Sequence, residues 1–431
     1  MTTRRHGTNP GRKLIMGFLG IIILGGFLLS LPISQTTQGV IPPLDAYFIS
    51  TSAVCVTGLS TVNISQTLSF FGRIVLALLM QIGGIGYATF SLFLHVLLRQ
   101  RISLAQRILA REALNQETGM DIIGLVKLVT FFSLGLEGVG TLLLFIAFQG
   151  KMDSLSALGM GLFHSISAYN NAGFDLFGNS FCDYSGNVLV NLTVIVLIVL
   201  GGIGFFVISD VLSKKKWKHF TFHTKIVIST TLVLIVAGMV LLHLTSGISW
   251  LESLFLSVST RTAGFNSVDT GALAPAALTI AIILMWIGAS SGSTGGGIKT
   301  TTFFTIITAM RAVVTRREAS AFHRKIALDS ILKAFCVAFL SLTAIMIAVL
   351  GLCQIEGNRF SFMSLLFEAV SAISTTGLSC GITGDLQAGS KWILMFLMFI
   401  GRLGPLTIVG SLSMQKPSNG IHCVEEHIII G

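Results

Sequence analysis

The chain has 431 residues, of which 52% are hydrophobic and only 11% are charged. Soluble domains carry about 25% charged residues, so this composition excludes an ordinary soluble protein and predicts a polytopic membrane protein. The net charge of +10 does not indicate nucleic-acid binding, because the Lys and Arg residues gather in the connections between apolar runs. The six cysteines show no metal-ligand spacing, so we expect free thiols and no metal-cysteine site.

The first part of the chain contains one long, one short and one long apolar run. A basic segment, 1–13, precedes the run at 14–31, which has the basic flank of a secretory signal. Its length, the lack of a small-residue cleavage motif and its place in the first repeat predict an uncleaved span instead. The run at 44–54 is shorter than the roughly 20 residues that a span needs, and another long run follows at 68–98. We therefore expect a span, a re-entrant helix with its loop, and a second span.

This pattern occurs three more times. The corresponding apolar runs are 125–148, 155–169 and 188–212, then 226–244, 250–260 and 273–314, then 331–352, 362–374 and 392–412. Each short run is followed by a small residue, a glycine and then Phe or Leu; the glycines are Gly58, Gly173, Gly264 and Gly377. Four matches between paired long runs indicate an internal repeat. The predicted fold is all-α, with eight spans and four re-entrant pore loops around a pseudo-fourfold central pore.

The repeats define the expected organisation of the chain. It comprises an N-terminal segment (1–13), pore repeats at 14–98, 99–212, 213–314 and 315–412, and a tail (413–431). Most of the 28 Lys and Arg residues lie in 1–13, 99–127, 213–225, 311–333 and the tail. The positive-inside rule then places both termini in the cytoplasm and makes the four loops enter from outside.

The four loops are the candidate ion-binding site. Each re-entrant helix would aim its partially negative C-terminal end at the centre, and loop carbonyls would replace the water shell of a dehydrated cation. Packing of small residues between helices would explain the glycines but not their position between short and long runs. The expected filter residues are Val56, Thr57, Gly58, Asn171, Ala172, Gly173, Thr262, Ala263, Gly264, Thr375, Thr376 and Gly377.

The third repeat carries a glycine-rich segment inside its second long run, and we expect this interruption only there. The segment cannot remain helical in lipid, so it should line the cavity beneath the filter as a gate. It is not a phosphate-binding loop, because the lysine is displaced by one residue and no strand precedes it. Arg402 lies well inside the last apolar run and is expected to face the pore rather than reach the interface. The expected gate residues are Gly292, Ser293, Thr294, Gly295, Gly296, Gly297, Lys299 and Arg402.

Other polar residues have less definite expectations. Arg261 and Glu368 lie in or beside re-entrant segments and are candidates for bracing the filter, whereas Glu137 and Glu252 have no assigned role. Three isolated histidines, His95, His164 and His243, are expected to be structural. Three aspartates follow the loops and either attract cations at the outer mouth or cap the loops; they are Asp175, Asp269 and Asp385.

The four loops, together with Gly292-Ser-Thr-Gly-Gly-Gly-Ile-Lys-Thr300 and Gly401-Arg-Leu-Gly-Pro405, resemble the Trk/Ktr/HKT potassium-transporter superfamily over residues 14–412. Two further N-terminal spans of Trk-type members are absent, so the chain is most similar to the membrane subunits of bacterial Ktr systems. The resemblance implies a K⁺-translocating pore subunit in the bacterial plasma membrane, with K⁺ at the filter residues. It also implies a homodimer and a cytoplasmic, KtrA-like ring of RCK subunits, with nucleotide only on that ring and no cofactor in this chain.

Two features of the loops concern ion selectivity. Sodium-preferring HKT members have Ser at the first filter glycine, and Gly58 argues against that preference here. The other loop sequences depart from one another, so a monovalent Na⁺/K⁺ channel or transporter of weaker selectivity is the alternative. An enzyme is not expected, because no paired aspartates, His cluster or Ser/Lys pair occurs at catalytic spacing. A structural or sensory membrane protein is the third hypothesis, which an ion-flux assay distinguishes.

Overall fold

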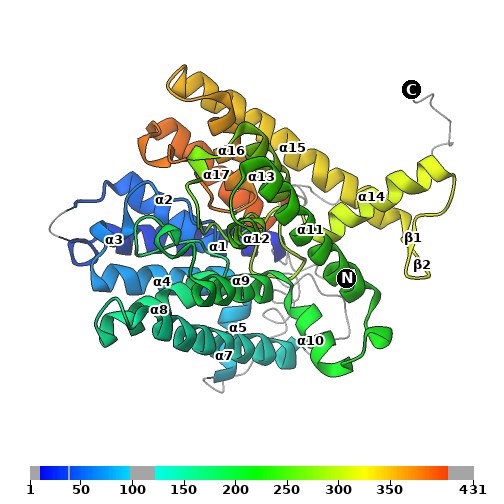
Figure 1. The fold of residues 1–431 in the computed structure, drawn as a ribbon, viewed down its shortest axis with the longest axis horizontal. Helices are drawn as coiled ribbons and strands as arrows, with labels where there is room; N and C mark the ends of the chain where they lie inside the picture. The colour runs from blue at the N-terminus through cyan, green and yellow to red at the C-terminus, as the bar shows by residue number, and fades with distance from the viewer. Residues whose placement is uncertain (1–9, 37–38, 98–121, 406–431) are drawn as a thin grey trace, which may run out of the picture.

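The computed structural model describes residues 10–36, 39–97 and 122–405. The described chain is largely helical, with one small hairpin formed by β1 (Ser320–Ala321) and β2 (Arg324–Lys325) (Figure 1). The N-terminal segment, the basic connection at 98–121 and the tail after 405 lie outside the described residues.

The four predicted repeats provide a grouping for the helices in chain order. The first repeat contains α1 (Pro10–Ser30), η1 (Pro32–Ser34), α2 (Pro43–Val54), α3 (Ile64–Thr67), α4 (Phe70–Ile85) and α5 (Tyr87–Leu97). The second contains α7 (Ile122–Phe148), α8 (Ser154–Tyr169), η2 (Cys182–Tyr184), α9 (Val188–Gly202) and α10 (Phe205–Lys214). The third contains η3 (Trp217–His219), α11 (Phe222–Ser246), α12 (Trp250–Ser259), η4 (Thr270–Ala272), α13 (Pro275–Trp286) and α14 (Thr300–Thr315). The fourth contains α15 (Leu328–Glu356), α16 (Phe362–Ile373), η5 (Thr383–Asp385) and α17 (Ala388–Leu403).

The four short helices α2, α8, α12 and α16 begin at residues that favour the N-terminus of a helix. Pro43 is the first residue of α2, where a missing amide proton costs nothing. The side chains of Asp153, Ser249 and Ser361 accept hydrogen bonds from the first-turn amides of α8, α12 and α16. Glu252 completes a capping box with Ser249, which gives this residue the role that the sequence left open.

The second long run of a repeat is broken more often than the sequence suggested. Within the described residues, four helices are long and apolar enough to cross a membrane, namely α1, α7, α11 and α15. The prediction of continuous second runs at 68–98 and 188–212 is wrong, because α4 and α5 meet at 98° and α9 and α10 at 95°. If each bent pair is one span, the count rises to six, so the length criterion does not reproduce the eight predicted spans.

The breaks occur at glycines with positive φ. Gly86 has φ of +85° and Gly204 has φ of +97°, values that side chains with a Cβ rarely adopt. Gly404, which ends α17, has φ of +86°. The interruption is therefore not confined to the third repeat, where α13 and α14 are separated by the longer non-helical segment 287–299.

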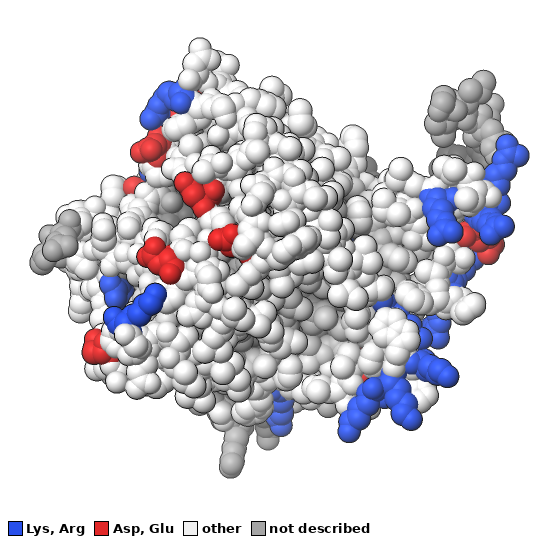
Figure 2. Space-filling view, viewed as in Figure 1, with Lys and Arg blue, Asp and Glu red and all other residues white. Residues whose placement is uncertain are grey.

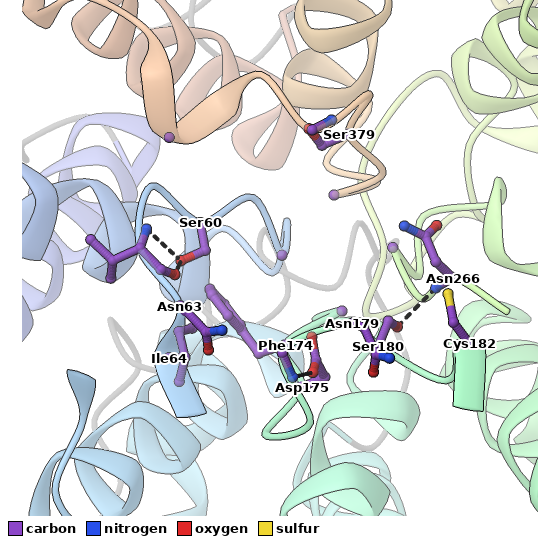
Figure 3. Close-up of a pocket in the computed structure, with 18 of the residues that line it drawn as sticks. Ser60, Asn63, Ile64, Phe174, Asp175, Asn179, Ser180, Cys182, Asn266 and Ser379 are labelled. Atoms are coloured by element: carbon purple, nitrogen blue, oxygen red, sulfur yellow. Dashed lines mark hydrogen bonds between the residues drawn. The ribbon is translucent and has the colours of Figure 1, made fainter. Parts of the chain in front are cut away.

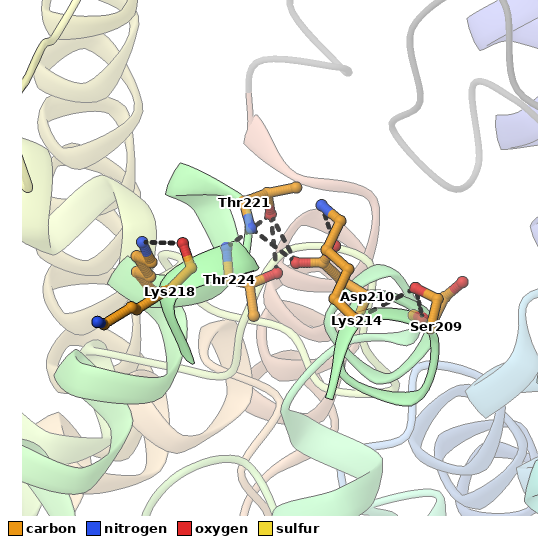
Figure 4. Close-up of polar contacts among 8 residues, drawn as sticks. Ser209, Asp210, Lys214, Lys218, Thr221 and Thr224 are labelled. Carbon is orange, nitrogen blue, oxygen red and sulfur yellow. Dashed lines mark hydrogen bonds and ion pairs between the residues drawn. The ribbon is translucent and has the colours of Figure 1, made fainter. Parts of the chain in front are cut away.

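Charged side chains are distributed unequally over the surface. In Figure 2, Lys and Arg gather at one end of the molecule, over α10, α14 and the hairpin, whereas most Asp and Glu in this view lie at the other end. Asp210 shapes the basic α10–α11 connection: it pairs with Lys214 at 2.7 Å and accepts from the Thr221 amide at 2.8 Å (Figure 4). These contacts fix the start of α11 and leave Lys215 and Lys218 exposed.

Candidate functional site

The four loops that follow the short helices share one backbone conformation. In each loop a residue with positive φ lies two positions before the glycine; these are Val56 (57°), Asn171 (56°), Thr262 (72°) and Thr375 (49°). The glycines themselves have φ of 99° at Gly58, 70° at Gly173, 76° at Gly264 and 90° at Gly377. A left-handed residue with a Cβ costs roughly 1–2 kcal/mol, so its recurrence in four loops indicates that the surroundings impose this shape.

A serine near the end of each short helix ties the loop back to the helix. The Ser52 carbonyl accepts from the Thr57 amide at 2.8 Å, and the Ser52 hydroxyl accepts from the Gly58 amide at 3.0 Å. Ser371 makes the same two bonds with Thr376 and Gly377, at 2.9 and 3.0 Å. In the other two loops, Ser167 and Ser259 donate to the carbonyls of Phe174 and Phe265. The sequence reasoning missed these serines, although each lies five or six residues before its glycine.

The four glycines form a closed ring, here called the glycine ring. A methyl group placed on Gly58 would lie 2.6 Å from the Ala172 carbonyl oxygen and 3.0 Å from the Cα of Gly173. The same relation continues from Gly173 to Gly264, from Gly264 to Gly377 and from Gly377 back to Gly58. The structure thus brings together the four segments that the sequence singled out, although they are far apart in the chain. No side chain fits at these positions without displacing backbone.

One side of the glycine ring opens into a polar cavity of about 640 Å³. All four ring glycines line it, and Figure 3 shows side chains from loops of several repeats around it, among them Ser60, Asn63, Asn179, Asn266 and Ser379. The residues two positions after the ring glycines, Ser60, Asp175, Asn266 and Ser379, therefore line this cavity.

Two of the three aspartates after the loops also line this cavity. Asp175 accepts from the Gly178 amide at 2.6 Å, and Asp269 accepts from the Gly271 amide at 2.9 Å. Each carboxylate thus both caps its loop and carries charge at the cavity. Asp385 is not among the lining residues; its carbonyl accepts from Arg359 at 3.0 Å.

Segment 287–299 lies against the other side of the glycine ring. Its ends are joined by a bridge between Ile287 and Ile298. Methyl groups on Gly295 and Gly296 would collide with the side chains of Thr262 and Thr375, which precede the ring glycines. Thr262 and Thr375 therefore face this segment, whereas the residues two positions after each ring glycine line the cavity on the other side.

Polar contacts hold segment 287–299 in place. The Gly292 carbonyl accepts from the Phe205 amide at 2.9 Å, and the Thr294 amide donates to the Gly201 carbonyl at 3.3 Å. Lys299 donates its ammonium to the Gly295 carbonyl at 2.8 Å and to the Gly296 carbonyl at 3.2 Å. The Ser293 hydroxyl donates to the Ser290 carbonyl at 2.7 Å.

Arg402 connects this segment to the first repeat. Its guanidinium donates to the Thr294 carbonyl and to the Gly83 carbonyl, and to the Gly84 carbonyl at 3.1 Å. Five donors in a planar fork allow one arginine to bind carbonyls of two elements at once. Arg402 therefore points into the protein interior and not to the membrane interface.

Glu368 and Arg261, the two candidates for bracing the filter, make different kinds of contact. Glu368 is fully buried and accepts from the Ser379 hydroxyl at 2.5 Å and the Thr383 hydroxyl at 3.0 Å, so it holds the chain that follows the fourth loop. Arg261 donates to the Thr231 carbonyl on α11 at 3.2 Å, so it anchors the third loop outward, away from the ring.

The three histidines expected to be structural, His95, His164 and His243, make local contacts. His164 accepts from the Leu176 amide at 3.2 Å and bonds the Met160 carbonyl at 2.8 Å. His243 stacks on Trp250 with ring centroids 3.8 Å apart, and His95 bonds the Ser91 carbonyl at 2.8 Å.

Two buried polar contacts between repeats had no signal in the sequence. Glu137 on α7 binds Gln81 on α4 and Asn170 at the end of α8. Lys391 on α17 binds Asp45 on α2 at 2.6 Å. Because the partners are distant in the chain, only the fold brings them together.

Comparison with known proteins assigns the fold and the sequence to one class. The family model TrkH, described as a cation transport protein, matches residues 27–248 and 227–422. The potassium transporter TrkH from Vibrio parahaemolyticus has the same fold, with a TM-score of 0.73 and 18% identity, over 96% of this chain and 86% of that one. The chain therefore belongs to the TrkH family of cation transport proteins, as the sequence resemblance predicted.

Several relatives match over nearly their whole length. "Ktr system potassium uptake protein B" from Bacillus subtilis is 39% identical over 95% of this chain and 94% of its own. The protein of the same name from Vibrio alginolyticus is 38% identical, covering 96% and 93%. "Potassium/sodium uptake protein NtpJ" from Enterococcus hirae is 33% identical, covering 99% and 98%. The family is one of membrane transporters and not of enzymes.

Proposed function

We propose that this chain is the potassium-translocating pore subunit of a bacterial K⁺ uptake system. The observation that carries the proposal is the closed glycine ring between a polar cavity and segment 287–299. The carbonyls just before the ring glycines, those of Thr57, Ala172, Ala263 and Thr376, each lie against the ring glycine of a neighbouring loop. Four neutral oxygens in this arrangement are suited to replace the water shell of a monovalent cation.

Two features favour K⁺ as the ion. The expected filter residues, from Val56–Gly58 to Thr375–Gly377, carry no charged side chain, so selection depends on carbonyl dipoles. The C-terminal ends of the four short helices converge there and add partial negative charge, which a dehydrated cation requires. Two relatives are named as potassium uptake proteins, and a third is named for potassium and sodium. Weaker selectivity between Na⁺ and K⁺ is therefore the alternative function.

We further propose that segment 287–299 is the gate. The segment lies against the threonines that precede two ring glycines, and Lys299 and Arg402 place two cationic groups there. A cation leaving the ring on this side would meet both the backbone and the two positive charges. Conduction then requires the segment to move aside and Arg402 to release the Thr294 carbonyl.

The topology and assembly belong to the same proposal. The concentration of Lys and Arg over α10, α14 and the hairpin (Figure 2) supports a cytoplasmic location for that end, with the cavity outside and both termini in the cytoplasm. We infer a plasma-membrane homodimer whose basic connections, including 311–325, dock a KtrA-like ring of nucleotide-binding RCK subunits. We propose 99–111 as a second docking segment; it lies outside the described residues. The boundaries of the four pore repeats given above remain part of this proposal.

Ion flux into liposomes tests this function. The purified chain would be reconstituted, and uptake of K⁺, Rb⁺ and Na⁺ compared with that of protein-free liposomes. The proposal predicts K⁺ and Rb⁺ flux that exceeds Na⁺ flux, and larger flux when the gate is weakened by Arg402→Ala. Flux at the protein-free level in both the parent and Arg402→Ala would refute the transport function.

A further inference from the structure

Glu137 is a buried carboxylate whose partners are all uncharged. It lies on α7 with only 4% of its surface exposed. Its Oε1 accepts from Gln81 Nε2 at 2.9 Å and from Asn170 Nδ2 at 3.1 Å, and no Lys, Arg or His among the described residues pairs with it. Burial of a charged or polar group at this depth is costly unless its hydrogen bonds are made. A hydrogen-bonded polar network in a buried site rigidifies the elements that it joins.

Asn170 is the residue that the Glu137 carboxylate positions. It ends α8 and directly precedes Asn171–Gly173, the contribution of the second loop to the glycine ring. Its side-chain amide donates to Gln81 Oε1 at 2.8 Å and to the Ile166 carbonyl at 2.9 Å, in addition to Glu137. The point where the second loop leaves its helix is therefore held from α4 and α7 together.

The α4 side of this contact is close-packed. A methyl group on Gly84 would collide with the Asn170 side chain, so α4 approaches the second loop directly there. The carbonyls of Gly83 and Gly84 on the same turn accept from Arg402. The last turn of α4 is thus fixed on two sides and provides a rigid reference for Asn170.

We propose that Glu137, acting through Gln81 and Asn170, is a specificity-determining residue that sets the position of the second loop in the glycine ring. The proposal rests on the assignment of the ring as the ion filter. A dehydrated Na⁺ is smaller than K⁺, so displacement of one of four carbonyl donors changes how well the two ions are distinguished. Without the Glu137 contacts, the carbonyls of the second loop can move inward and coordinate the smaller Na⁺. Discrimination against Na⁺ then falls.

Two substitutions separate hydrogen bonding from charge. Glu137→Gln keeps an acceptor for Gln81 and Asn170 but removes the charge, whereas Glu137→Met removes both. Since positioning depends on the acceptor, we expect Glu137→Met to raise the Na⁺-to-K⁺ flux ratio about tenfold and Glu137→Gln to raise it at most about threefold. Gln81→Met disturbs the same contact from α4 and should raise the ratio in the same direction, even if Glu137→Met does not fold.

Glu356 is the matched control. It is a buried carboxylate with 2% exposure, and it accepts from Ser390 Oγ at 2.6 Å and the Gln387 amide at 2.8 Å. Unlike Glu137, it also pairs with a cationic side chain, Arg359, at 2.9 Å. The Ser390 and Gln387 contacts hold α15 to α17, and none of its partners is part of the glycine ring. Glu356→Met should therefore lower thermal stability without changing the flux ratio.

The experiment compares Na⁺, Rb⁺ and K⁺ flux in liposomes for the parent and the four variants, with melting temperatures measured in detergent. If neither the parent nor Arg402→Ala transports K⁺, the filter assignment is overturned, and this inference with it. If the parent transports K⁺ but Glu137→Met and Gln81→Met keep its flux ratio, this inference alone is wrong. An equal change of ratio in Glu356→Met would also overturn it, because a general loss of stability would then explain the effect.

Discussion

Lys391 and Asp45 are 346 residues apart in the chain, yet they form an ion pair with an N–O distance of 2.6 Å. The side chains are only 12% and 9% exposed, and they join α17 of the fourth repeat to α2 of the first. Between α13 and α15, by comparison, Trp286 donates an uncharged hydrogen bond to the Ser341 hydroxyl at 3.2 Å. The Lys391–Asp45 pair therefore joins α17 to α2 with a charged contact.

We expect Lys391→Met to destabilise the protein strongly. It leaves Asp45 buried without its partner, and breaking a buried pair in this way costs about 3–5 kcal/mol. The measurement is thermal unfolding in detergent, with Lys333→Met as the control. Lys333 pairs with Asp329 at 2.6 Å, but these side chains are 61% and 74% exposed, so its loss should cost no more than about 1 kcal/mol. Equal effects of the two substitutions would show that the Lys391–Asp45 pair does not hold the repeats together.

Gly58→Ser should increase Na⁺ flux relative to K⁺ flux. Gly58 has φ of +99°, and its Cβ position lies 2.6 Å from the Ala172 carbonyl oxygen, so a side chain must displace the ring. Gly357→Ser is the control, because Gly357 also has a positive φ, +58°, but open space around it. Flux ratios in liposomes decide the matter: an unchanged ratio in Gly58→Ser would contradict the role given to the glycine ring.

The topology can be tested by labelling with a membrane-impermeant thiol reagent in a cysteine-free background. Lys215 lies in the basic α10–α11 connection and Lys151 lies between α7 and α8, and both are exposed. We expect Lys151→Cys to react in intact cells and Lys215→Cys to react only after the cells are opened. The reverse pattern would invert the proposed orientation.

Weakening the gate should raise K⁺ flux in the absence of any partner protein. Arg402→Ala removes the bonds from Arg402 to the Thr294 and Gly83 carbonyls, and deletion of 292–297 removes the glycine-rich part of the obstructing segment. Both variants are first checked for folding by gel filtration in detergent. A well-folded deletion variant with flux no higher than the parent would show that segment 287–299 is not the barrier.

The sequence predicted the short helices well because each has clear ends. The run expected at 44–54 is α2 at Pro43–Val54, and the run expected at 362–374 is α16 at Phe362–Ile373. The bends at Gly86 and Gly204 were missed, because a Gly-Gly-Ile-Gly sequence in an apolar run does not reveal whether the helix continues. Hydropathy records burial in lipid but not the direction of the chain.

The supporting contacts of the site could not be predicted in the same way. Glu137 meets Asn170 because α7 and α8 pack together, and 33 residues separate them in the chain. Likewise, the sequence indicated that Arg402 faces inward but not that it binds the Gly83 carbonyl, 319 residues away. Such pairs depend on how helices that are distant in the chain pack against one another, and no local sequence pattern encodes this packing.

The central claim is that a dehydrated K⁺ binds in the glycine ring. Rb⁺ is a close chemical substitute for K⁺ and scatters X-rays anomalously, so crystals grown with Rb⁺ in place of K⁺ would locate the ion directly. The account predicts an anomalous peak among the carbonyls of Thr57, Ala172, Ala263 and Thr376, and its loss when Na⁺ replaces Rb⁺. A well-ordered ring without an anomalous peak among these carbonyls would contradict it.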